Sequence, residues 1–119
     1  MTVNRLIVLA LLILSTSCGR RAQIDPADAA KAEALWQQHE NAVVRALHGV
    51  SRGEEFAEAS LFFHQLTGIQ IHGDGSFVGW LPTAGAEQDL QRLRLWHRWN
   101  QGRIYWDEKS HSVKVLPPT

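Results

Sequence analysis

Residues 25–49 read DPADAAKAEALWQQHENAVVRALHG, the clearest structural pattern in the chain. Asp25 can cap the free backbone N–H groups at a helix start, and Pro26 fits the first helical position. Apolar residues then recur every three or four positions, as one buried face of a helix requires. Because Gly49 is a natural helix end, the sequence predicts a helix over 26–48.

Two further helices are predicted, one over 53–67 and one over 84–100, since each range has an apolar stripe at helical spacing. The expected N-caps are Ser51 for the first of these helices and Thr83 for the second. The stripe of the last helix covers more than half of its circumference, so we expect this helix to pack on two sides.

The rest of the chain predicts short β structure. Residues 69–82 alternate and contain a Gly-Asp-Gly turn signal, which indicates a short hairpin or an ordered loop. Residues 103–107 and 112–116 are expected to form two strands around a polar turn. The predicted fold class is α+β: three helices, a short loop or hairpin after the second helix, and a C-terminal β-hairpin packed on the third helix.

The N-terminus has the three-part architecture of a secretory signal peptide. Arg5 gives a positive start, residues 6–14 are nine consecutive apolar residues, and small residues lead to Cys18, the only cysteine of the chain. Nine apolar residues are too few to span a bilayer, which takes about 20.

The segment LSTSCG at 14–19 resembles the lipobox of bacterial lipoproteins, with Ser15 at a position where that family usually has an apolar residue. The resemblance implies that the leader is cut before Cys18 and that its sulfur carries the lipid. Several acyl chains provide lasting membrane attachment. Gly19 in place of aspartate implies sorting to the outer membrane.

The resemblance also implies a domain organisation: a signal peptide over 1–17, a lipidated N-terminus and tether over 18–25, and a single globular domain over 26–119, facing the periplasm. Two alternatives stay open. Cleavage by the general signal peptidase after Ser17 would give a soluble periplasmic protein, and an uncleaved leader would itself be the anchor.

A second resemblance involves the C-terminal third of the chain. The stretch Trp96-x-x-Trp99-Asn100, followed by IYWD at 104–107, is similar to the end of small uncharacterised bacterial proteins. That similarity supports the fold and implies no activity.

Composition and motifs argue against several classes of function. Lys and Arg total 12, as do Asp and Glu, so there is no clustered positive charge for nucleic acid. His39-Glu40 begins like the zinc motif H-E-x-x-H, but Val43 occupies the second histidine position. No G-x-S-x-G nucleophile motif is found. We therefore expect no catalytic residues, no metal and no cofactor, and a protein that is not an enzyme.

The tryptophans are divided between core and surface. Helical spacing predicts that Trp36, Trp96 and Trp99 are core residues. The residues of a possible binding surface, for a glycan or a partner's side chain, are Trp80, His72, Asp74 and Trp106. The alternative for the tryptophans is an anchor that holds the loop to the third helix.

The leading functional hypothesis is a non-enzymatic binding or adaptor domain in the cell envelope, with the membrane and an envelope protein as its partners. One alternative is a periplasmic immunity or inhibitor lipoprotein against a toxin or hydrolase. The other is a peptidoglycan-binding or peptidoglycan-acting protein that uses the loop around Trp80.

Overall fold

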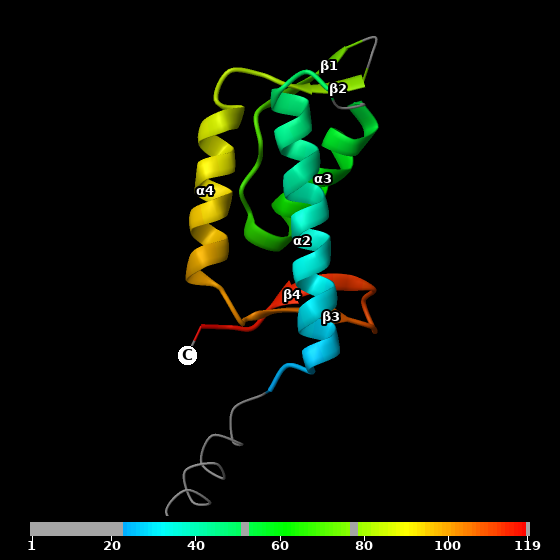
Figure 1. The fold of residues 1–119 in the computed structure, drawn as a ribbon, viewed down its shortest axis with the longest axis vertical. Helices are drawn as coiled ribbons and strands as arrows, with labels where there is room; N and C mark the ends of the chain where they lie inside the picture. Colours follow the sequence, from blue (N-terminus) through cyan, green and yellow to red (C-terminus); the bar gives the residue numbers. More distant parts are fainter. Residues whose placement is uncertain (1–22, 51–52, 77–78, 119) are drawn as a thin grey trace, which may run out of the picture.

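The computed structural model describes residues 23–50, 53–76 and 79–118. Two helices, α2 and α4, run antiparallel along the long axis, with α3 beside them, and one small β-hairpin lies at each end (Figure 1). The helices are α2 (Pro26–Leu47), α3 (Gly53–Thr67) and α4 (Ala86–Trp99). The antiparallel hairpins are β1 (Gly73–Ser76) with β2 (Gly79–Pro82), and β3 (Ile104–Asp107) with β4 (Ser112–Val115).

The structure confirms the α+β fold class of three helices and a C-terminal hairpin, and the segment after α3 is the hairpin β1–β2. The largest contact of the C-terminal hairpin is between β3 and α2, and β4 also touches α3. This arrangement follows from the alternation of β3, which buries Ile104 and Trp106 against the helices. The hairpin follows α4 in the chain and packs against α2 and α3.

The ends of α2 are as the sequence predicted. The side chain of Asp25 accepts a hydrogen bond from the backbone N–H of Ala27 at 2.8 Å, and Pro26 is the first helical residue. Gly49 follows the last turn with a φ of 73°, the left-handed conformation that ends many helices.

The prediction that Thr83 caps the last helix is wrong. Gly85 is the N-cap, with a φ of 98° and no side-chain hydrogen bond. Thr83 acts through its backbone: its carbonyl accepts from the N–H of Ala86 at 3.1 Å, and its N–H donates to the carbonyl of His72 at 3.1 Å. Its backbone therefore ties the end of β2 to the segment before β1. Ser51, the cap predicted for α3, lies outside the described residues.

The core is centred on Trp36, which is 1% exposed. Its ring meets the ring of Phe63 edge-on, with centroids 4.7 Å apart. It also stacks on Trp96 and His97, at centroid distances of 5.6 Å and 4.5 Å, so one side chain joins all three helices. Burial of each such large side chain contributes about 1.5–3 kcal/mol. The buried cluster begins at Ala32, so the chain from α2 onward provides its own core.

Trp99 is not a core residue, contrary to the prediction from its spacing. It is 77% exposed, and Leu95, one turn earlier on α4, is 52% exposed. The buried side of α4 is formed instead by Leu90 and Leu93. Trp99 is the last residue of the helix, and the described part of the chain leaves most of its side chain exposed.

No helix in the described ranges combines the length and the apolar character needed to cross a membrane. The leader and Cys18 lie outside these ranges.

Candidate binding groove

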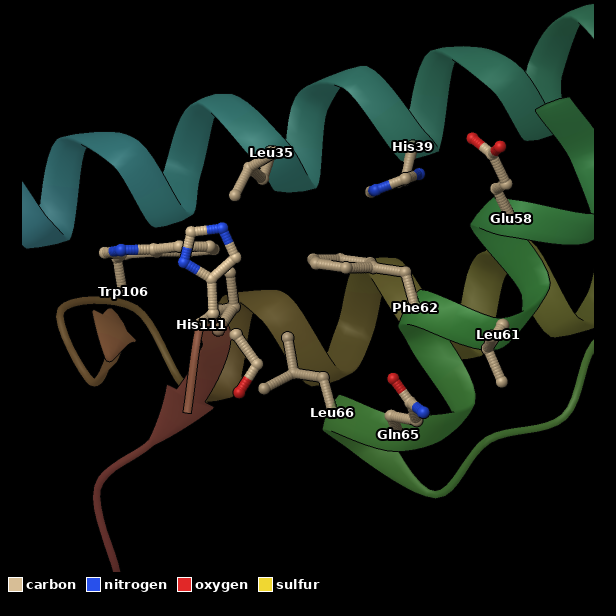
Figure 2. A pocket seen from close by; sticks show the side chains of 11 residues that line it. Leu35, His39, Glu58, Leu61, Phe62, Gln65, Leu66, Trp106 and His111 are labelled. Atoms are coloured by element: carbon tan, nitrogen blue, oxygen red, sulfur yellow. The ribbon is translucent and has the colours of Figure 1, made fainter. Parts of the chain in front are cut away.

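A groove of about 280 Å³ opens between α2, α3 and the C-terminal hairpin (Figure 2). Its walls are mostly apolar and aromatic, and its polar groups come from two histidines, Glu58, Gln65 and Ser112. The lining side chains are Leu35, His39, Glu58, Leu61, Phe62, Gln65, Leu66, Trp106, His111, Ser112 and Val113.

Helical spacing sets the two long walls of the groove. Leu35 and His39 are four residues apart on α2, and Phe62 and Leu66 are four residues apart on α3, so each pair lies on one face of its helix. The rings of His39 and Phe62 stack across the gap, with centroids 4.2 Å apart (Figure 2). This contact joins the two walls and fixes the width of the groove.

Trp106 closes the hairpin end of the groove. It is 8% exposed, and its indole N–H donates to Glu108 Oε2 at 2.6 Å. Lys31 Nζ lies 3.9 Å from the ring centroid, in a cation–π contact, and His111 meets the ring edge-on at 4.8 Å. Trp106 was predicted as a possible open stacking surface; the structure makes it a fixed, buried wall.

His39 adds a group that responds to pH. Burial lowers the pKa of His39 from 6.5, and the nearby carboxylate of Glu58 only partly offsets this effect. The imidazole is therefore neutral at neutral pH, which leaves the α2 wall uncharged. Glu58 then provides the negative charge of the groove.

Sequence reasoning named Trp106 but missed the other residues of this groove. His39 shares the apolar stripe of α2 with Leu35, and that position was the available signal. His111 gave no such signal, since its φ of 53° in the turn between β3 and β4 depends on the folded hairpin.

The other predicted surface residues lie in or next to the hairpin β1–β2, and the side chain of Trp80 lies outside what the structure describes. His72 lines a shallow hollow with Thr83, and Asp74 is not among the residues lining it. Asp74 is exposed in β1, where it pairs with Leu81. Trp80 lies in β2, where its backbone pairs with Gly75.

The partner of His72 is Asp89, a residue that the sequence did not single out. Asp89 is 2% exposed and accepts from the His72 backbone N–H at 2.8 Å and from Nδ1 at 2.5 Å. Burial raises the pKa of Asp89, but the hydrogen bonds from His72 oppose this effect. The net pKa is below the ordinary value. A carboxylate only accepts, so Nδ1 of His72 carries the proton of this bond.

In a catalytic triad, a buried aspartate likewise orients the histidine that acts as general base. No hydroxyl group in the described ranges is hydrogen-bonded to Nε2 of His72. The pair joins α4 to the segment that leads into β1. The only sequence signal for Asp89 was its place in the first turn of α4.

Within the described ranges, no three His, Cys, Asp or Glu side chains gather as a metal site. No protein-family model, curated protein or solved structure matches the chain. The groove and its surroundings are therefore interpreted from their own geometry.

Proposed function

We propose that this chain is a lipid-anchored, non-enzymatic binding domain of the bacterial cell envelope, whose groove receives apolar side chains of an envelope protein. The observation that carries the binding role is the preformed apolar groove between Leu35, Phe62 and Trp106. The location rests on the LSTSCG segment at 14–19, with Cys18 as the lipidated residue and the outer membrane, on its periplasmic side, as the destination.

The groove is small for a binding site. Its volume of about 280 Å³ is at the lower end of the range for small-molecule and cofactor pockets, which is about 300–1,000 Å³. One or two side chains fit such a volume. Phe62 and Trp106 are aromatic walls held by their own contacts, so little conformational entropy is lost when a partner binds.

The charges of the groove indicate what accompanies the apolar anchor. Glu58 lies at one end of the groove, and the neutral ring of His39 lies between it and the apolar walls (Figure 2). A lysine or arginine beside the anchor residue would meet Glu58. The preferred ligand is therefore a short segment with one aromatic or aliphatic side chain and a neighbouring cation.

Site-specific photocrosslinking in cells tests this proposal. A photoreactive amino acid at Gln65, on the exposed edge of the groove, is compared with the same group at Gln91, on the exposed side of α4. We expect a discrete crosslinked envelope protein from Gln65 only. This crosslink should be lost when Phe62→Ala removes the aromatic wall of the groove. Crosslinking that is equal at both positions, or unchanged by Phe62→Ala, would contradict the proposal.

The identity of the captured partner decides between the binding role and two narrower roles. A secreted toxin or hydrolase that the chain inhibits would make it an immunity or inhibitor lipoprotein. Competition by soluble muropeptides would make it a peptidoglycan-binding protein.

A further inference from the structure

The exposed pair Leu95 and Trp99 is the starting observation. Both lie on α4, four residues apart, and are 52% and 77% exposed. Tryptophan is on average highly buried, so 77% exposure on an ordered helix requires a reason. Two neighbouring apolar side chains of this kind form a small contact surface.

This surface lies at one particular end of the molecule. The end of α4, the start of α2 and the C-terminus are all at the end of the C-terminal hairpin, whereas β1 and β2 are at the opposite end (Figure 1). A hollow lined by Ile24, Tyr105 and Leu116 shows that the chain enters α2 alongside this hairpin.

The length of the tether sets how this end can lie. Gln23 is five positions after Cys18, and this stretch reaches only about 18 Å even when fully extended. Helix α2 has 22 residues and is about 33 Å long. A lipid on Cys18 would therefore hold the hairpin end near the bilayer, and the β1–β2 end would be directed away from it.

We propose that Trp99 and Leu95 lie in the membrane interface, so that the hairpin end of the domain rests on the lipid headgroups. This inference rests on the proposed lipid anchor. The amphipathic indole of tryptophan favours the boundary between headgroups and acyl chains. Lys and Arg beside such residues attract anionic headgroups.

The charges at this end are mixed, with Asp25 and Asp28 at the start of α2 and Arg98 near the end of α4. Asp107 is paired with Lys114 at 2.9 Å, and Glu108 accepts from Trp106, so these two acidic groups have partners inside the hairpin. Arg98 is exposed beside Trp99 and makes no ion pair with any described residue.

A second copy of the chain is a poorer match for the same surface. A stable protein interface buries about 800 Å² on each partner. A fully buried aromatic side chain gives about 150–250 Å², so Trp99 with Leu95 falls well short. A membrane interface needs no such area, because the lipid anchor already holds the domain in place.

Quenching by brominated phospholipids tests the inference. The chain from Cys18 onward, which contains the whole described core, is coupled through its single thiol to a maleimide phospholipid in vesicles of phosphatidylcholine and phosphatidylglycerol. Brominated acyl chains quench tryptophan emission only at close range. We expect Trp99→Phe to remove about half or more of the quenched emission, because Trp99 is the most exposed indole described.

Val50→Ser is the matched control, since Val50 is 73% exposed but follows the end of α2 that is distant from Cys18. It should leave the quenching unchanged, whereas Leu95→Ser should reduce it, and circular dichroism verifies that each variant is folded. Quenching of Trp99→Phe equal to that of the parent would overturn the inference. So would a dimer of the uncoupled chain, detected by sedimentation, that Trp99→Phe dissociates.

The coupled lipid replaces the natural one, so these results do not depend on how the cell modifies Cys18. An unmodified Cys18 in cells would refute the proposed anchor. Absence of quenching by the tethered domain would refute the membrane contact alone.

Discussion

Asp89 receives two hydrogen bonds from His72 on a single carboxylate oxygen, one from the backbone N–H at 2.8 Å and one from ring Nδ1 at 2.5 Å. Gly85 lies close to this pair, because a Cβ added at Gly85 would lie 3.2 Å from Nδ1 of His72. The pair joins α4 to the segment that leads into β1, at the end of the molecule opposite the C-terminal hairpin.

Asp89→Asn should destabilise the fold by about 1–3 kcal/mol, because the two hydrogen bonds from His72 lose their charged acceptor and the amide NH2 places donors where the carboxylate has only acceptors. Urea unfolding followed by circular dichroism measures the change. Arg92→Ala is the control: Arg92 is 3.4 Å from Asp89 and its side chain is 65% exposed, so its loss should have little effect. An equal effect of the two substitutions would contradict this account of Asp89.

Gly85→Ala should be more destabilising than Gly68→Ala. Both glycines have positive φ, 98° and 78°, which costs an alanine about 1 kcal/mol. A Cβ at Gly85 would also lie 3.2 Å from Nδ1 of His72, whereas a Cβ at Gly68 would have nothing within 4 Å. Thermal unfolding of the two variants gives the comparison, and equal melting temperatures would show that the imidazole does not pack as described.

Acid should weaken the C-terminal hairpin through Asp107. The Lys114 ammonium and the Ser110 hydroxyl donate to this carboxylate and lower its pKa from 3.8 to about 2. A carboxyl group with a lowered folded-state pKa stabilises the fold above its unfolded value and loses that contribution as pH falls through the folded value. Stability should therefore fall between pH 3.8 and about 2.

The matched variant for this window is Asp107→Asn, which cannot titrate. Its stability should be lower than that of the parent at neutral pH and should fall less steeply in acid. Urea unfolding at a series of acidic pH values measures both slopes, and parallel slopes would exclude Asp107 as the source of the acid sensitivity.

His39 should make the groove sensitive to mild acid. Because burial lowers the pKa of His39 from 6.5, the neutral ring stabilises the fold above pH 6.5, and this contribution is lost as pH falls through the lowered folded-state value. His39→Gln should reduce the loss of stability below pH 6.5. NMR titration of the imidazole measures the shift directly, and a midpoint above 6.5 would be the opposite of what we expect.

Local signals in the sequence were sufficient to predict most of the fold. Asp25 and Pro26 indicated the start of α2, because capping depends on a few neighbouring residues. A hairpin after α3 was expected too, but its turn was predicted in the wrong place: Gly73, Asp74 and Gly75 lie in strand β1. Thr83 shows the limit of such reasoning. A good capping residue stood in the right place, but Gly85, with a φ of 98°, is the N-cap instead.

Less of the candidate site could be predicted. The groove joins His39 and Phe62 to Trp106 across three elements, and no spacing along the chain encodes such a contact. The prediction that Trp99 is buried was wrong for a related reason. Its spacing fits an apolar helix face, but whether another element covers that face depends on the packing of the whole domain. Asp89 was hidden because a buried acid and a solvated acid look alike in a sequence.

The central claim is that the domain is held in the envelope by lipid on Cys18. Intact-mass and N-terminal peptide mass spectrometry of the protein from its native membranes tests it most directly. The account predicts a chain that begins at Cys18 and carries a diacylglyceryl group on sulfur, together with a protein that leaves the membrane only in detergent. A free thiol at Cys18 in a chain that washes off in plain buffer would contradict it.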